Sequence, residues 1–307
     1  MNRNNKNDAH SIFRRLLNRA KTNNEDFNLL LSRYGMERLL YRLSVSPHND
    51  RFVLKGASLF LVWKGRNYRV TRDADLLGFG NAEIEQLANV FRKICRVESQ
   101  GDGMIYLPES LSAEEIREDQ EYDGVRITLI GMLSRARIPL RVDIGFGDAI
   151  TPAPEKIEYP TLFDAPSPLL KAYPRYTLVA EKVEAMVKLG LANSRMKDFY
   201  DLWLVSRLFS FEGKVLQNAL ENTFGRRRTT FPASTPFAFT PAFYADPQKT
   251  VQWKAFVKKS KPDIPIVDLS AVIADVVVFI LPVIDSLKSN ISFENEWLPD
   301  RGWRIRS

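Results

Sequence analysis

The chain has 307 residues, 45% of them hydrophobic, which is enough for one large soluble domain or two ordinary ones. Its formal net charge of +7 favours polyanionic partners such as nucleic acid or nucleotide phosphates. The single cysteine excludes an internal disulfide and fits a reducing cytoplasm, and the first residues carry no secretory signal pattern. With two histidines, neither a histidine-rich zinc site nor a Ser-His-Asp triad is expected.

Residues 1–50 are predicted to form a helical lead-in to the rest of the chain. Leucine pairs at helical spacing mark residues 8–45, and residues 47–50 interrupt that pattern. A short apolar strand is expected at residues 51–54, ending at Lys55 and Gly56. A helix is expected to begin at Ser58, directly after this strand.

Residues 51–175 are predicted to be an α+β core. Strands are expected at residues 73–79, 125–129 and 138–144, with an amphipathic helix at 81–96. A turn at residues 134–137 joins the last two strands, which indicates an antiparallel hairpin. Pro139 fits an edge or a strand start better than a central position, because proline cannot donate a backbone hydrogen bond.

Residues 176–307 are predicted to be a helical C-terminal domain. Helices are expected at residues 177–190, 195–208, 211–223, 248–260 and 267–288. The last segment is the most apolar, but it contains Asp275, Asp285 and Pro282, and its uncharged run is too short to cross a bilayer. We therefore expect a buried helix and no membrane partner.

Two aspartates in the 73–79 segment are the first candidates for chemistry. Residues i and i+2 of a strand point the same way, so Asp73 and Asp75 would share one face, with Ala74 on the other. Neighbouring like charges need compensation, and Mg²⁺ supplies it because it binds carboxylate oxygens together with water and phosphates. Alternatively, these acids are ordinary solvated residues, or they pair with Arg69 and Arg72.

A third carboxylate comes from the 138–144 strand. Apolar residues alternate along this strand and define its buried face, so Asp143 lies on the opposite face. A strand with Asp-x-Asp beside a strand with one Asp matches two-metal phosphoryl transfer, in which the ions lie roughly 3.5–4 Å apart. Asp73, Asp75 and Asp143 are therefore the predicted metal ligands.

A glycine turn precedes the acids. Gly56 permits a tight turn, and the Ser58 hydroxyl with the free N–H groups of the following helix can hold a phosphate. Such junctions are common, so the turn by itself is a weak signal. The order of a Gly-Ser turn, a helix, Asp-x-Asp and a later strand Asp favours a nucleotide site, with Arg72 as a further nucleotide contact.

Taken together, these motifs resemble the AbiEii/AbiGii toxin family of the DNA polymerase β-like nucleotidyltransferase superfamily. The resemblance rests on LKGASL at residues 54–59, RVTRDADL at 69–76, LVAEK at 178–182 and RMKDFYDL at 195–202. It covers about residues 50–210, and WKAF at 253–256 extends it faintly. Ala57 stands where the family often has a second glycine, and its methyl group would tighten the turn.

The resemblance implies a mixed-sheet nucleotidyltransferase core with flanking helices, and a toxin of a toxin–antitoxin or phage-defence system. Family members transfer nucleotides from a nucleoside triphosphate (NTP), in known cases to the 3′ end of tRNA. The expected cofactor is therefore Mg²⁺, or Mn²⁺ in its place, and the expected partners are an NTP, RNA and a cognate antitoxin. The matching positions imply a triphosphate contact at Ser58, metal ligands at Asp73 and Asp75, a triphosphate or catalytic role for Lys182, and a catalytic role for Asp198.

The residues of the second half are compatible with these roles. Lys182 lies on a predicted helix whose Val183 and Met186 pack inward, and the alternative is a solvated helix lysine. Asp198 and Asp201 are three residues apart and hence on one side of their helix. The alternative for both is a surface acid paired with neighbouring bases, and we favour Asp198 over Asp201 as the functional residue.

Two basic clusters are candidates for RNA backbone contacts, the arginines at residues 226–228 and the lysines at 258, 259 and 261. Each is also explained as a solvated surface patch. Two other functions stay open: a nucleotidyltransferase that modifies a protein such as its antitoxin, and a non-catalytic nucleic-acid-binding protein. The intact set of Asp73, Asp75 and Asp143 argues against the second.

Overall fold

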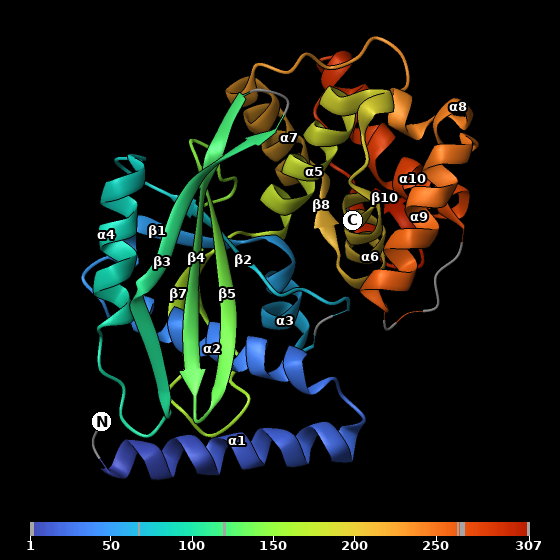
Figure 1. Ribbon diagram of the computed structural model, residues 1–307. Coiled ribbons are helices and arrows are strands. Elements are labelled where there is room, and N and C mark those ends of the chain that lie inside the picture. The colour runs from blue at the N-terminus through green and yellow to red at the C-terminus, as the bar shows by residue number, and fades with distance from the viewer. Residues whose placement is uncertain (1–2, 67, 119–120, 263, 265–267, 306–307) are drawn as a thin grey trace. The chain divides into compact units, whose positions relative to one another are not determined.

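The computed structural model describes residues 3–66, 68–118, 121–262, 264 and 268–305. The chain divides into two compact units, which we call the first unit (Met1–Gly147 with Glu155–Ala172) and the second unit (Asp148–Pro154 with Tyr173–Ser307). The first unit contains one large mixed sheet with helices, and the second unit is mostly helical (Figure 1). This combination confirms the predicted fold class.

The sheet of the first unit has seven strands in the order β3-β4-β5-β2-β1-β7-β6. β2 runs parallel to β5 and β1 runs parallel to β7, whereas the remaining neighbours are antiparallel. The strands are β1 (Phe52–Lys55), β2 (Ala74–Gly78), β3 (Met104–Glu118), β4 (Glu121–Leu133), β5 (Ala136–Phe146), β6 (Glu155–Glu158) and β7 (Leu169–Ala172).

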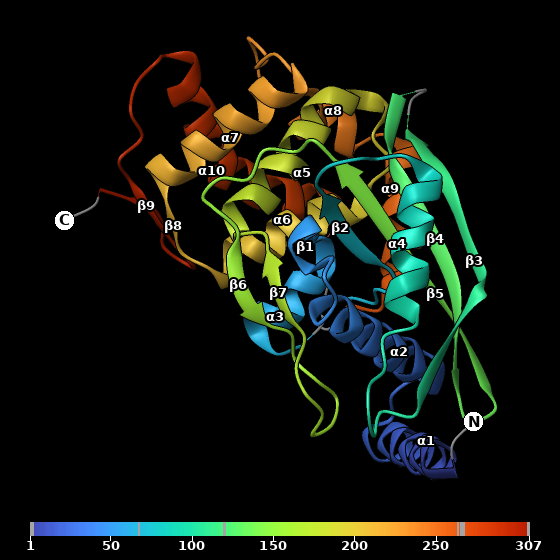
Figure 2. The ribbon, with the colours of Figure 1, turned by 90° about the vertical axis from the view of Figure 1, so that its left-hand side faces the viewer.

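Helices cover the apolar face of this sheet (Figure 2). The α-helices of the unit are α1 (Arg3–Asn23), α2 (Phe27–Ser44), α3 (Leu59–Lys64) and α4 (Ile84–Cys95), and η1 (Asn49–Arg51) and η2 (Gly56–Ser58) are short 3₁₀ turns. α2 packs so closely on β5 that a Cβ at Gly35 would lie 3.2 Å from Ile138. α4 packs on the same face, where Phe91 stacks edge-on against Phe52 at 5.6 Å.

The predicted β4–β5 hairpin is confirmed, and both strands are longer than predicted. Pro139 lies opposite Ile130 of β4, and the pairing of β5 with β2 begins only at Val142, so Pro139 precedes the central part of the sheet. β3 was not predicted, because its register with β4 shifts between Leu107 and Ser112 and this irregularity breaks the two-residue alternation.

The second unit contains all five helices predicted after residue 176. They are α5 (Arg175–Leu189), α6 (Met196–Leu208), α7 (Gly213–Arg227), α9 (Pro247–Ser260) and α10 (Leu269–Lys288). The short α8 (Pro241–Tyr244) and the 3₁₀ turns η3 (Gly190–Ala192) and η4 (Phe237–Phe239) were not predicted. Neither was a small sheet in the order β10-β9-β8, made of β8 (Phe211–Glu212), β9 (Glu296–Leu298) and β10 (Gly302–Arg304).

Within the described residues, α10 is the one helix long and apolar enough to cross a membrane. Over its most apolar window the mean hydropathy is 2.1, and 44% of that window is buried in the protein. Phe279 is fully buried against Phe211 and Trp297, and its carbonyl accepts a hydrogen bond from Trp303 Nε1 at 2.9 Å. This packing is consistent with the core helix of a soluble protein.

Candidate functional site

A row of charged residues crosses the polar face of the seven-stranded sheet. Strand pairing places Lys55 opposite Asp75, and Asp75 opposite Asp143. It continues with Asp143 opposite Arg126 and Arg126 opposite Glu114. Directly opposed residues send their side chains to the same face at about 4.5–5.5 Å between Cβ atoms, so the row brings two of the three predicted carboxylates side by side.

Asp73 lies on the same face, one residue before β2 begins. Its Oδ2 is 3.6 Å from Nη1 of Arg141, which precedes Asp143 by two residues on β5 and therefore points the same way. Ala74 and Leu76 are each 1% exposed, which places them on the opposite, covered face as predicted. The side chain of Asp73 is 42% exposed, so solvent and ligands reach its oxygens.

The glycine turn is built against the second acid. A Cβ at Gly56 would lie 2.0 Å from Oδ2 of Asp75, so the carboxylate rests directly over the glycine backbone. Gly56 also has a φ of +77°, a conformation that disfavours other residues. Both the close carboxylate and the positive φ therefore require glycine at position 56. The pairing of Lys55 with Asp75 brings the two predicted motifs into contact.

Ser58 and Arg72 lie beside these acids, at a narrow pocket near the start of β2. With Asp73 they line the pocket, and Arg33 of α2 and Tyr159 lie on its wall. Its volume is about 30 Å³, which suits a water-sized group and not a base. The Ser58 hydroxyl donates to the Lys55 carbonyl at 3.2 Å and α3 has only six residues, so the phosphate contacts assigned to Ser58 and Arg72 stay predictions.

Asp143 is held by an arginine through two short hydrogen bonds. Arg126 Nε donates to Oδ1 and Nη2 donates to Oδ2 of Asp143, each at 2.9 Å. These hydrogen bonds are the main reason why the pKa of Arg126 is raised. The bidentate pair engages both carboxylate oxygens of Asp143.

The donor set fits a divalent cation through two carboxylates and not through three. Within the described ranges, no three His, Cys, Asp or Glu side chains are arranged to hold one ion together. Mg²⁺ is commonly bound by one or two protein carboxylates, with water and substrate phosphates completing its shell. Asp73 and Asp75 supply such a pair of hard oxygen ligands, and Asp143 would join them only after release by Arg126.

The predicted residues Lys182 and Asp198 lie in the second unit, in a buried ion-pair cluster between α5 and α6. Lys182 Nζ is 2.5 Å from Asp198 Oδ1 and 2.9 Å from Asp201 Oδ2, and Arg195 Nε is 2.9 Å from Asp198 Oδ2. Burial opposes ionisation, but Lys182 and Arg195 hold the pKa of Asp198 well below its usual range. Lys182 is therefore not a solvated lysine, and the two aspartates are not surface acids.

Within the 226–228 arginine cluster, the candidate for RNA contacts, Arg227 is engaged by acids of the protein itself. Its Nη2 is 2.8 Å from Asp148 Oδ1, and its Nη1 is 2.7 Å from Glu184 Oε2. Burial alone would lower the pKa of Arg227, but the surrounding acids raise it. Arg226 and Arg228 are exposed at the end of α7, as are the lysines at residues 258, 259 and 261 on and just after α9.

Arg126, Arg141 and Arg33 were missed by sequence reasoning. Arg126 and Arg141 each stand between apolar residues of an alternating strand, and this spacing was a usable signal that they point to the polar face. No such pattern marks Arg33, whose place at the narrow pocket depends on how α2 packs.

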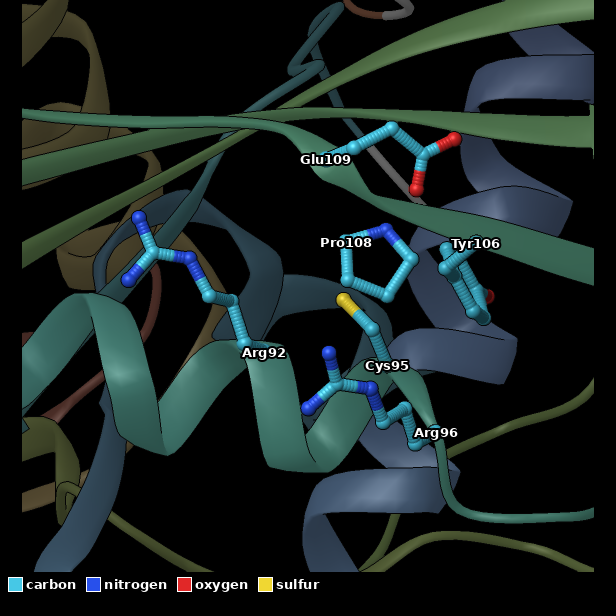
Figure 3. A pocket seen from close by; sticks show the side chains of 6 residues that line it. All are labelled: Arg92, Cys95, Arg96, Tyr106, Pro108 and Glu109. Atoms are coloured by element: carbon cyan, nitrogen blue, oxygen red, sulfur yellow. The ribbon is translucent and has the colours of Figure 1, made fainter.

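A second and larger pocket lies between α4 and β3 and holds none of the predicted site residues (Figure 3). Its volume is about 600 Å³, and it is lined by Arg92, Cys95, Arg96, Tyr106, Pro108 and Glu109. Burial raises the pKa of the Cys95 thiol to about 12, so this thiol is protonated and unreactive near neutral pH. We therefore assign no nucleophilic role to Cys95.

Comparison with known families identifies the chain. The profile described as nucleotidyl transferase AbiEii toxin, type IV TA system, matches residues 38–275. The chain belongs to this family. The matched segment includes every predicted site residue, from Gly56 to Asp198, so the nucleotidyltransferase and toxin assignments of the sequence are confirmed at the level of the family.

The chain is also similar to solved structures. MenT4, a nucleotidyltransferase toxin from Mycobacterium tuberculosis H37Rv, is 16% identical with a TM-score of 0.50, over 92% of this chain and 99% of that chain. JHP933 from Helicobacter pylori is 14% identical with a TM-score of 0.49, over 85% of this chain and 94% of that chain. At such identity the likeness to MenT4 concerns the fold. A comparison with curated proteins finds no match.

Proposed function

We propose that this toxin-family nucleotidyltransferase transfers a nucleotide from an NTP to RNA, at the 3′ end of tRNA, with Mg²⁺ as its cofactor. The observation that carries the proposal is the pair Asp73 and Asp75, held on one face of the sheet beside the Gly56 turn. Carboxylates in this position serve phosphoryl transfer, whereas a fold that only bound RNA would have no need of them.

In the proposed reaction, the 3′ hydroxyl of the RNA forms a bond to the α-phosphorus of the NTP, and pyrophosphate leaves. Asp73 and Asp75 would bind the cation, which when present neutralises phosphate charge and activates the hydroxyl. Ser58 and Arg72 are assigned to the triphosphate. The family resemblance gives Lys182 a triphosphate or catalytic role. Asp198 and Asp201 act through Lys182, because they fix its position and favour its protonated form.

The choice of RNA as acceptor rests on charge. The net charge is +7, and Arg226, Arg228 and the lysines at residues 258, 259 and 261 are exposed, as backbone binding by counterion release requires. A cytoplasmic location fits an RNA acceptor and an NTP donor, and a cognate antitoxin is the proposed protein partner.

The test is an acceptor assay. The protein is incubated with total RNA, Mg²⁺ and each of the four α-labelled NTPs in turn, and products are separated on RNA and protein gels. We expect label in the tRNA band with wild-type protein and none with Asp73→Asn or Asp75→Asn. Label on protein would favour a protein-modifying enzyme, and no label on either would contradict nucleotide transfer under these conditions.

A further inference from the structure

Arg126 forms a bidentate ion pair with Asp143, the third predicted metal ligand. It lies on β4 directly opposite Asp143, and its guanidinium takes both carboxylate oxygens at 2.9 Å. On its other side Asp143 lies opposite Asp75. Arg126 thus engages one acid of the neighbouring pair Asp75 and Asp143. In the described part of the chain, no three carboxylates are arranged to hold one ion together.

Arg126 also has a second carboxylate within reach. Glu114 lies opposite it on β3, with Oε1 4.0 Å from Arg126 Nη1. The two acids differ in exposure, since the side chain of Glu114 is 65% exposed and that of Asp143 is 23% exposed. The guanidinium therefore lies between an inner acid beside the catalytic candidates and an outer acid in solvent.

We propose that Arg126 is a displaceable counterion, which neutralises Asp143 until a divalent cation binds and then moves to Glu114. The physical reason is competition: a bidentate guanidinium and a metal ion are both positively charged, and both bind the carboxylate of Asp143. Displacement turns a two-carboxylate site into the three-carboxylate site that the sequence predicts. Arg126 is a positioning residue in this scheme, and the inference rests on the proposed function because it assumes cation binding at Asp73 and Asp75.

A purely structural role for Arg126 predicts the opposite sign. If the arginine only fixed the sheet face, its removal would leave Asp143 unpaired and would loosen the site, so cation affinity would fall or stay unchanged. If it competes with the cation, its removal strengthens cation binding. Loss of one bidentate charge-assisted contact corresponds to a gain of about tenfold in affinity, given the partial exposure of the pair.

The measurement is Mn²⁺ affinity of the whole protein, from the electron paramagnetic resonance signal of free Mn²⁺ and without any NTP. We expect Arg126→Gln to bind Mn²⁺ about tenfold more tightly than wild type. Arg126→Lys should lie between the two, because it keeps the charge but cannot hold both oxygens of Asp143. The gain should vanish when Asp143→Asn is combined with Arg126→Gln. Circular dichroism confirms that each variant is folded.

Arg137→Gln is the matched control, because it removes the same charge from an exposed position six residues before Asp143 on β5. At about 20 Å along the strand this charge is screened at physiological salt, so affinity should stay at the wild-type level. The inference would be overturned, with the metal assignment intact, if Arg126→Gln bound Mn²⁺ no more tightly than wild type and Asp75→Asn still abolished binding. Binding that Asp75→Asn left intact would overturn both the inference and the metal assignment.

Discussion

Asp73 and Asp198 were both predicted from short acidic motifs, yet their surroundings are opposite. The side chain of Asp73 is 42% exposed, and its ion pair with Arg141 spans 3.6 Å. The side chain of Asp198 is 2% exposed, and it contacts Lys182 at 2.5 Å and Arg195 at 2.9 Å. One acid is open to a ligand, and the other is neutralised inside the protein.

This difference separates two uses of an aspartate. A weakly paired, exposed carboxylate contributes little to stability and keeps its oxygens available for a cation. A buried carboxylate between two bases cannot lose a partner without leaving a charge uncompensated. Mutations of the exposed acid should therefore act on activity with little effect on stability, whereas mutations in the buried cluster should lower stability as well.

The largest stability effect is expected for Asp198→Asn. It leaves Lys182 and Arg195 with one fewer carboxylate in a buried cluster, and breaking such a pair costs about 3 kcal/mol of unfolding free energy. The matched control is Asp285→Asn, because Asp285 is 61% exposed and pairs with Lys288, so its loss should stay within about 0.5 kcal/mol. Urea unfolding followed by circular dichroism measures both, and equal effects would erase the contrast between buried and exposed acids.

Gly56→Ala should reduce nucleotide transfer by about a hundredfold, because its methyl group displaces the Asp75 carboxylate and a misplacement of about 1 Å has this effect. Gly65→Ala is the control: Gly65 has a similar φ of +70°, but a Cβ there meets nothing within 4 Å. Both variants carry the same backbone strain, of about 1–2 kcal/mol. Transfer rates are compared at equal concentrations of folded protein. An equal loss of transfer rate in both variants would show that backbone strain, and not the clash with Asp75, is responsible.

Glu37 of α2 tests whether burial also determines the pKa of an acid in the first unit. Burial raises the pKa of Glu37 to about 7 from its ordinary 4.5, so the folded state holds the proton more tightly than the unfolded state. Stability from this group is therefore present below about pH 4.5 and is lost as pH rises through 7. Glu37→Gln should reduce the fall in unfolding free energy between pH 5 and 8 by about 1–3 kcal/mol. An unchanged pH dependence would contradict the assignment.

The smallest effect is expected for RNA binding. Arg226→Gln with Arg228→Gln should lower the slope of log affinity against log salt by about one to two, since each exposed arginine contacts at most one phosphate. Arg227→Gln should leave that slope unchanged and lower stability, because its guanidinium is bound to Asp148 and Glu184. A wild-type affinity that is independent of salt would reject RNA as the main partner.

Local patterns predicted much of the fold. Helical spacing placed α5, α6, α7, α9 and α10, and alternation placed the β4–β5 hairpin, because both signals lie within one segment of the chain. The order of the sheet was out of reach, since β1 pairs with β7 more than a hundred residues away and such pairing leaves no local trace. The irregular β3 was missed for the reason that its bulge removes the alternation.

The same limit applies to the site. The i, i+2 rule placed Asp73 and Asp75 on one face, and the apolar alternation of β5 placed Asp143 on its polar face. That Arg126 holds Asp143 follows from the β4–β5 register, and the role of Asp201 beside Lys182 follows from how α5 meets α6. Sequence therefore named the acids, and only packing shows which of them are neutralised.

The central claim is that Asp73 and Asp75, on the polar face of the sheet in the first unit, carry the chemistry. The most direct test measures incorporation of α-labelled NTP into RNA by Asp75→Asn and wild-type protein, at equal concentration and saturating Mg²⁺. The account predicts a loss of at least about a thousandfold, as expected when a metal ligand needed for phosphoryl transfer is removed, with the unfolding free energy within about 1 kcal/mol of wild type. Transfer by Asp75→Asn near the wild-type rate would contradict it.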